Sequence, residues 1–259
     1  MVSYLNEEAI MATKRTDMKP FFEFLDTQVN NHSIYCLGTQ GETVASLTIN
    51  KIVSLEDGKA NAARVLRHIA ELLPTSSFDI NKAKSFDCSG LGCNYLQNIT
   101  GVYTYDHKAN DMYKECVEIP MNKLQPGDFV FGHFYTDGRA GHVGYVDADG
   151  YIVEARGRDY GVVKRKVADG DWTKAGRPNV WNYEMHRALK RGDIGTDVGQ
   201  LQARLKHFGY DCGTVDNDFG VKTYNALARF QEAKYPKAPE IGVMDKKTAK
   251  KLGFTLVTS

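Results

Sequence analysis

The sequence predicts an α+β fold followed by a small all-α domain. Residues 17–96 carry apolar residues at helical spacings of three and four. Residues 128–167 change to short runs rich in Phe, Tyr, Val and Ile, separated by turn residues, which is the pattern of antiparallel strands. From Arg187 onward the helical spacing returns. Helices first and strands after, without alternation between them, favour an α+β domain.

The N-terminal part is expected to form three helices before any strand. In MKPFFEFLDTQV, the residues Phe22, Leu25 and Val29 share one helical face. A second helix is expected over residues 57–73, and the proline that follows ends it. A third helix is expected to begin near Cys88, where apolar residues again follow a helical spacing.

Strands are expected in DFVFGHFY, HVGYV, YIVEA and GVVKRKV. In the C-terminal part, a stripe of apolar residues predicts a helix and consists of Val198, Leu201, Leu205 and Phe208. Two further helices are expected in TYNALARFQEAKY and DKKTAKKLG. We therefore expect two domains, over residues 1–183 and residues 187–254.

The composition excludes several classes of protein. The chain has 259 residues, 42% of them hydrophobic, and a formal charge of +1, which gives no field to attract nucleic acid. No run approaches the roughly 20 apolar residues that cross a bilayer, so membrane insertion is not expected. The five cysteines include no CxxC pair, and Asp216 and Asp218 lack the glycine and distal glutamate of a calcium loop. No metal and no cofactor is expected, and the cysteines should be reduced.

One cysteine has a particular position, because FDCSGLGCNYL places Cys88 where a helix is expected to begin. Unpaired N–H groups at a helix start favour the thiolate, which is the nucleophilic form. A thiol of this kind needs a base from elsewhere in the chain. Among the seven histidines, His142 is the best placed, because it opens the expected strand HVGYV.

The hairpin that follows His142 can be paired by counting. If Gly150 adopts the left-handed conformation in a three-residue turn, Asp147 pairs with Tyr151. This register makes His142 and Glu154 diagonal neighbours on one face of the sheet. The opposite face is apolar and carries Val143, Tyr145, Val153 and Ala155.

Together these residues predict a nucleophile, a base and an orienting carboxylate. The thiolate of Cys88 would attack a carbonyl, His142 would move the proton, and Glu154 would hold the imidazole. Taken singly, Cys88 and His142 also fit buried structural roles, and Glu154 fits a solvated carboxylate on a strand. Arg156 faces His142 in the same register but only donates hydrogen bonds, so we place it with the substrate-binding residues.

The motifs DCSGL, LQPGDFVF, HVGYV and VEARGRDYGVV, in this order, resemble the NlpC-type papain-like cysteine peptidases that cut bacterial cell-wall peptides. The segment YCLGTQGE, which begins at Tyr35, resembles the tyrosine-containing loop of that family. The resemblance implies a papain-like arrangement of N-terminal helices packed on an antiparallel sheet. It also implies that Cys88 is the nucleophile of a thioester acyl-enzyme, His142 the base and Glu154 the third polar residue.

By the same resemblance, Tyr35 lies beside the thiol, and Asp87 and Ser89 line the subsite that receives the start of the stem peptide. Helix-start residues such as Asp87 and Ser89 also have an ordinary capping role. The resemblance makes bacterial peptidoglycan the expected partner. The sequence carries no signal for an oligomeric state.

The C-terminal segment resembles a three-helix peptidoglycan-binding module, through KRGDIGTDVGQLQARLKHFGY and VDNDFGVKTYNALARFQ. The residues expected to border a glycan site are Asp216, Phe219, Thr223 and Asn225. A packing domain without a ligand is the alternative for this module.

The expected function is that of an endolysin-like peptidoglycan hydrolase, which cuts the amide between D-γ-glutamate and the diamino acid of the stem peptide. The N-terminus carries no secretory signal, so we expect synthesis in the cytoplasm of a bacterial host and action on the wall after release. Met1 and Met11 both fit as the start. The alternatives are an N-acetylmuramoyl-L-alanine amidase with the same triad, a catalytically silent wall-binding protein, and a cytosolic acyltransferase.

Overall fold

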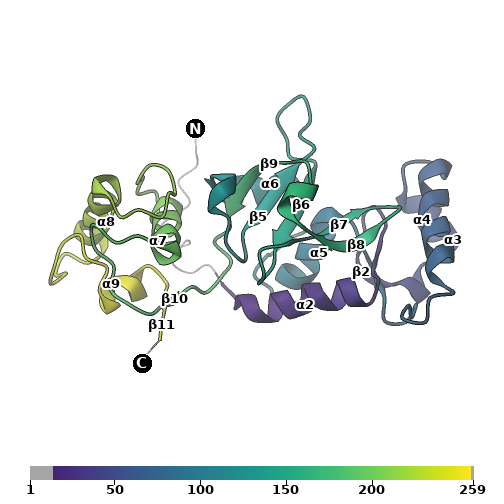
Figure 1. Cartoon of the computed structure of the whole chain (residues 1–259), viewed down its shortest axis with the longest axis horizontal. Helices are drawn as coiled ribbons and strands as arrows, with labels where there is room; N and C mark the ends of the chain where they lie inside the picture. Colours follow the sequence, from purple (N-terminus) through teal and green to yellow (C-terminus); the bar gives the residue numbers. More distant parts are fainter. Residues whose placement is uncertain (1–13, 258–259) are drawn as a thin grey trace. The chain divides into compact units, whose positions relative to one another are not determined.

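The computed structural model describes residues 14–257 and shows two compact units (Figure 1). The larger unit consists of residues 18–114 and 126–173. The described part of the smaller unit consists of residues 14–17, 115–125 and 174–257.

Two expectations stay predictions. The two units are defined by internal packing and each is made of several segments, so they do not give domain bounds along the sequence. The limits 1–183 and 187–254 therefore remain the predicted bounds of the two domains. The alternative start at Met11 lies outside the described residues.

The larger unit combines helices with two sheets. Its helices are α2 (Met18–Asn30), α3 (Ile49–Leu55), α4 (Lys59–Leu72), α5 (Cys88–Cys93) with the π-helix η2 (Asn94–Ile99), and α6 (Ala109–Glu115). Its strands are β1 (Ile34–Tyr35), β2 (Gln40–Thr43), β3 (Lys84–Phe86), β5 (Phe129–Gly132), β6 (His142–Val146), β7 (Ile152–Gly157) and β8 (Gly161–Arg165). Short 3₁₀ turns are η1 (Val44–Ser46) and η4 (Val167–Asp169).

Strands β5, β6, β7 and β8 lie in this order in an antiparallel meander, as the sequence predicts. In a second sheet, β3 lies between β1 and β2, parallel to β1 and antiparallel to β2. Helix α5 packs against β6 and β7, and α3 and α4 form a hairpin at one end of the unit (Figure 1). The fold class is therefore α+β with an antiparallel sheet, which confirms the prediction.

The core of the larger unit is aromatic around one tyrosine of β6. The ring of Tyr145 lies 5.7 Å from that of Phe21 and 5.0 Å from that of Phe129, both near perpendicular. Edge-to-face pairs of this kind add to the free energy gained by burial. A second apolar cluster lies under the α3–α4 hairpin and consists of Ile34, Cys36, Val44, Ile52, Ala62, Val65, Phe78 and Ala83.

The structure corrects two details of the N-terminal prediction. Strands β1 and β2 precede the helix at Cys88, so strands are not confined to the second half of the unit. Strands of two to four residues are too short to show an alternating pattern. Helix α2 buries Phe21, Leu25 and Gln28, not Phe22 and Val29, so its buried face is rotated by one residue.

The smaller unit contains helices α7 (Thr196–His207), α8 (Val221–Lys234) and α9 (Lys246–Lys251), which confirms its predicted helical character. Its short strands and turns are β4 (Val117–Ile119), η3 (Met121–Lys123), β10 (Glu184–Met185) and β11 (Thr255–Leu256), and β9 (Trp172–Arg177) leads into it. The predicted apolar stripe from Val198 to Phe208 is buried. Over residues 14–257, none of the helices has the length and apolar character needed to span a membrane.

Candidate functional site

The hairpin of β6 and β7 has the register that the sequence predicts. Gly150 is left-handed, with φ at 82°. The backbone N–H of Asp147 donates to the carbonyl of Tyr151 at 2.9 Å. As a result, His142 Nε2 lies 2.5 Å from Glu154 Oε2, and both residues are buried.

Glu154 is held as a carboxylate by partners on two strands. Its side chain has no exposed surface. Burial alone would raise the pKa of Glu154, but the hydrogen bonds from His142 and from Arg165 of β8 outweigh burial and lower it. A carboxyl group whose pKa is lowered on folding stabilises the fold above its unfolded pKa, and this contribution is lost as the pH falls through the folded value.

His142 is fixed on a second side by an aromatic ring. Trp172 stacks on the imidazole with the ring centroids 5.4 Å apart and the planes 10° from parallel. Gly144 makes room for this ring, because a Cβ there would lie 2.9 Å from Trp172. Burial lowers the pKa of His142, but hydrogen bonds with Cys88 and Glu154 outweigh burial and raise it to about 9.

Cys88 is the first residue of α5, as predicted. Asp87 caps this helix by accepting the N–H of Gly90 at 2.6 Å. Tyr145 fixes the helix to the sheet, because its hydroxyl donates to the Cys88 carbonyl and accepts the N–H of Gly92, both at 3.2 Å. The thiol is half-buried, and its Sγ lies 3.9 Å from a backbone carbonyl of the segment before β6. Because Nε2 of His142 contacts Glu154, the other imidazole nitrogen, Nδ1, is available for the hydrogen bond with the thiol.

The predicted substrate-binding residues differ in their contacts and exposure. Tyr35 pairs with Phe86 in the β1–β3 ladder, just before Cys88. Asp87 accepts one N–H on each carboxylate oxygen and a hydrogen bond from the Ser89 hydroxyl, so it also has the capping role. Arg156 is exposed and lies over the ring of Tyr160 at 4.0 Å.

Sequence reasoning missed Arg165 and Trp172. The diagonal rule that links His142 with Glu154 also finds Arg165, because Arg165 pairs with Ile152, two residues before Glu154 on β7. A register shift after Ala155 hides this pairing from simple counting. No local signal in the sequence indicates the position of Trp172 over the imidazole.

A thiol, an imidazole and a buried carboxylate in this order form the nucleophile–base–orienter arrangement that thiol-dependent hydrolases share. Residues 77–177 match the NlpC/P60 family, and residues 194–252 match the family described as "Putative peptidoglycan binding domain". The chain therefore contains an NlpC/P60 domain followed by a peptidoglycan-binding domain.

Similar proteins share shorter stretches. The chain is 49% identical over 47 residues to a spore cortex-lytic enzyme of Bacillus cereus, which is 18% of each chain. It is 51% identical over 37 residues to the N-acetylmuramoyl-L-alanine amidase CwlM of Mycobacterium tuberculosis, which is 14% of this chain and 9% of that protein. The chain thus spans less than a fifth of the length of these relatives.

Among solved structures, the peptidoglycan hydrolase RipB of Mycobacterium tuberculosis is similar with a TM-score of 0.39 and 18% identity, over 68% of this chain and 72% of that chain. The P60 domain of an antigen from M. avium subspecies paratuberculosis has a TM-score of 0.36 and 16% identity, over 68% of this chain and 98% of that chain.

In residues 14–257, no group of three or more His, Cys, Asp or Glu side chains is arranged to hold a metal ion. None of the five cysteines, all of which lie within residues 14–257, forms a disulfide.

In the smaller unit, the predicted glycan-site residues differ in exposure. Asp216 and Asn225 are exposed, whereas Phe219 and Thr223 are buried. The loop that carries Asp216 and Phe219 is organised by the buried amide of Gln202. This amide donates to Asp216 Oδ1 at 2.7 Å and to Thr223 Oγ1 at 3.0 Å, and it accepts backbone N–H groups of the loop.

Replacing Gln202 with alanine should therefore destabilise this unit. The change leaves buried donors and acceptors unpaired, which costs about 1–3 kcal/mol. We expect a lower thermal unfolding midpoint, measured by circular dichroism, with Gln200→Ala as the half-buried control on the same helix. An unchanged midpoint in Gln202→Ala would show that the loop does not depend on this amide.

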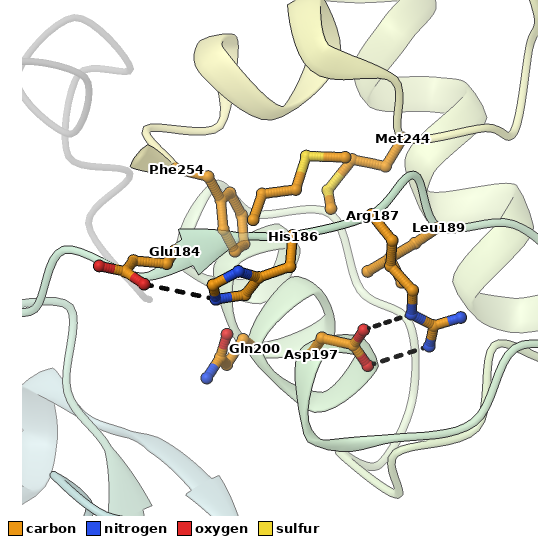
Figure 2. Close-up of a pocket in the computed structure, with 9 residues that line it drawn as sticks. Glu184, His186, Arg187, Leu189, Asp197, Gln200, Met244 and Phe254 are labelled. Atoms are coloured by element: carbon orange, nitrogen blue, oxygen red, sulfur yellow. Dashed lines mark hydrogen bonds and ion pairs between the residues drawn. The ribbon is translucent and has the colours of Figure 1, made fainter. Parts of the chain in front are cut away.

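A small hollow of the same unit is formed by other residues (Figure 2). Within it, Arg187 Nε donates to Asp197 at 2.7 Å, and His186 lies 3.3 Å from Glu184. It is lined by Glu184, Met185, His186, Arg187, Leu189, Asp197, Gln200, Met244 and Phe254.

Proposed function

We propose that the chain is a peptidoglycan hydrolase that cuts an amide bond of the stem peptide, between D-γ-glutamate and the diamino acid. The observation that carries the proposal is the contact of His142 with the buried carboxylate of Glu154, beside the thiol at the start of α5. The matches to the NlpC/P60 family and to the peptidoglycan-binding domain support the choice of substrate.

In the proposed mechanism, the Cys88 thiolate attacks the carbonyl carbon of the scissile amide. His142, as the imidazolium, gives its proton to the leaving amine, and a thioester remains on the sulfur. His142 then accepts a proton from water, which attacks the thioester carbonyl and displaces the Cys88 thiolate, so that the carboxylic acid leaves and the thiolate and the imidazolium are restored. Glu154 and Trp172 hold the imidazole in place throughout, and N–H groups at the start of α5 stabilise the developing oxyanion.

The second domain would keep the hydrolase on its polymer. Binding to the wall raises the effective concentration of stem peptides without adding a catalytic contact. An enzyme that joins these two activities is suited to lysis of a bacterial cell, and we infer an endolysin-like role that is exerted on the wall after release from the cytoplasm.

The pKa of His142, raised to about 9, predicts the alkaline limit of this activity. The imidazolium persists below that pH and is lost above it, so the rate should hold from neutral pH and then fall about tenfold per pH unit. Initial rates of peptide cleavage in a buffer series test this, with circular dichroism to show that the fold is intact. A fall that begins near the ordinary histidine value of 6.5 would contradict the pairing.

The bond itself is identified by mass spectrometry of fragments released from purified cell walls. The proposal expects new amino groups on the diamino acid and new γ-carboxyl groups on D-glutamate. Release of intact stem peptides that begin with L-alanine would instead establish an amidase. Binding without any release would leave a wall-binding protein.

A further inference from the structure

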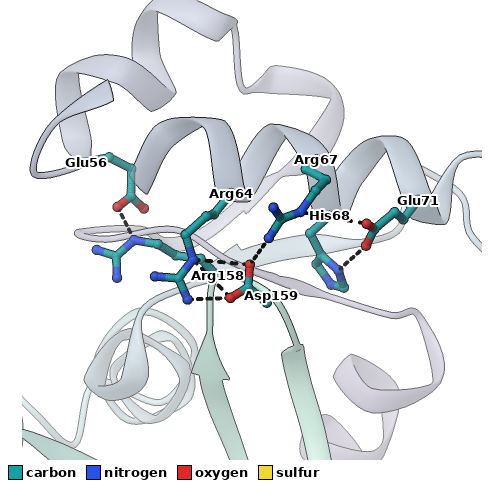
Figure 3. A network of polar contacts seen from close by, with 7 residues as sticks. All are labelled: Glu56, Arg64, Arg67, His68, Glu71, Arg158 and Asp159. Atoms are coloured by element: carbon teal, nitrogen blue, oxygen red, sulfur yellow. Dashed lines mark hydrogen bonds and ion pairs between the residues drawn. The ribbon is translucent and has the colours of Figure 1, made fainter. Parts of the chain in front are cut away.

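The turn between β7 and β8 carries a second feature of the larger unit, a network of charged residues that fixes it to the α3–α4 hairpin (Figure 3). Asp159 of this turn is bound by Arg64 and also by Arg67 Nη2, the latter at 2.7 Å. The neighbouring Arg158 donates from Nε to Glu56 at 2.5 Å. Two successive residues of the turn are thus held by α4 and by Glu56, the residue that follows α3.

Glu56 links this turn to the tyrosine-containing loop that begins at Tyr35. Its side chain is fully buried, and its other oxygen accepts the N–H of Leu37 at 2.9 Å. Glu56 therefore fixes Arg158 relative to Tyr35, and the guanidinium carbon of Arg158 lies 5.4 Å from the centre of the tyrosine ring. A buried ion pair with an aromatic neighbour restricts a long side chain to one position.

Tyr35 in turn lies near the start of α5, which carries the thiol. Tyr35 pairs with Phe86, two residues before Cys88, and the N–H of Gly38 in the same loop donates to Asp87 at 3.0 Å. Cys88 and Arg158 both affect the pKa of the Tyr35 phenol. Burial and then the negative charge of Cys88 raise this pKa, while the positive charge of Arg158 lowers it.

Arg158 also has N–H groups that are not used in the contact with Glu56. Its side chain is 18% exposed. Within residues 14–257, only Nε has a hydrogen-bond partner, so Nη1 and Nη2 are open to a ligand. A guanidinium has no acceptor, and two adjacent N–H groups match the two oxygens of a carboxylate.

We propose that Arg158 binds a carboxylate of the stem peptide, the free α-carboxylate of the D-glutamyl residue whose γ-carbonyl Cys88 attacks. The assignment of this carboxylate rests on the proposed function. Arg158 is then a specificity-determining residue, and the α3–α4 hairpin serves to hold it. A stem in which this carboxylate is amidated would be a poorer ligand.

The test measures binding, so that it does not depend on cleavage. Isothermal titration of the Cys88→Ala full-length protein uses two synthetic peptides, L-Ala-γ-D-Glu-L-Lys and the same peptide with the α-carboxylate of glutamate as a carboxamide. We expect the carboxylate peptide to bind about tenfold more tightly or better, the range for a charge-assisted hydrogen bond. Adding Arg158→Gln should remove the preference and leave the affinity for the carboxamide peptide within about twofold.

Two further variants separate recognition from structure. Arg158→Lys keeps a cation for buried Glu56 and should retain part of the preference, even if Arg158→Gln fails to fold. Arg67→Ala removes an exposed arginine from the same network and should bind both peptides as the Cys88→Ala protein does. Equal binding of the two peptides, or no binding of either, would overturn the inference, as would an equal loss for both peptides in folded Arg158→Gln.

The proposed function is tested separately with the unsubstituted protein. If it cuts the carboxylate peptide but Cys88→Ala shows no preference, the role of Arg158 fails and the hydrolase remains. If the preference is present and neither peptide is cut, the proposed bond fails and the role of Arg158 as a carboxylate-binding residue remains.

Discussion

Replacing Cys88 with alanine is expected to lower the release of wall fragments by about a thousandfold or more, because no other group can form the acyl-enzyme. Binding to walls should be retained, since the change removes one sulfur from a half-buried site. The measurement is the rate of fragment release from purified walls, together with a co-sedimentation assay.

Cys116→Ala is the matched control, because Cys116 is the other half-buried thiol of the chain and belongs to the smaller unit. It should release fragments at the rate of the unsubstituted protein. Release by Cys88→Ala at that same rate would rule out thiol catalysis.

Replacing Glu154 with glutamine is expected to lower kcat by about a hundredfold or more, because a neutral amide stabilises the imidazolium of His142 less than a carboxylate does. The same change removes one of the interactions that raise the pKa of His142. The alkaline limit of activity should therefore move to lower pH. The measurement is kcat across a pH series, with a thermal melt to follow the weakening of the contact with Arg165 when the negative charge is removed.

Glu118→Gln is the control for charge, since Glu118 is an exposed strand carboxylate that pairs with Lys174 at 2.7 Å. It should leave kcat and its pH dependence unchanged. If Glu154→Gln kept both the rate and the alkaline limit of the unsubstituted protein, the carboxylate would have no part in orienting or charging His142.

The part of the site that could be predicted from the sequence is the part with a local signal. The β6–β7 register is determined by a glycine in a three-residue turn and by side chains that alternate strictly between the two faces of the sheet. His142 and Glu154 could therefore be paired by counting. The position of Cys88 at a helix start followed from the residues around it.

The rest depends on tertiary contacts. Arg165 reaches Glu154 across a second hairpin whose register shifts at a bulge between Ala155 and Gly157, and a bulge has no reliable signal in a single sequence. The same irregularity affects Arg156 at the end of β7 and Arg158 in the turn that follows. Counting indicated Arg156, which is exposed over Tyr160, whereas Arg158 is the one held beside Tyr35.

Helix packing explains a further difference. The register of α2 was read from hydrophobic residues alone, but Gln28 is buried because its side chain accepts a hydrogen bond from Ser33 at 3.0 Å. A satisfied polar group can take a core position, and this moves the buried face by one residue.

The central claim is that Cys88 attacks the stem peptide with the help of His142 and Glu154. An affinity label tests it most directly: a stem-peptide analogue with a chloromethyl ketone in place of the scissile amide, followed by peptide mapping. The account predicts one equivalent of label, all of it on Cys88, formed far more slowly when His142 is replaced by alanine and blocked by unlabelled peptide. Label on another cysteine, or none, would contradict it.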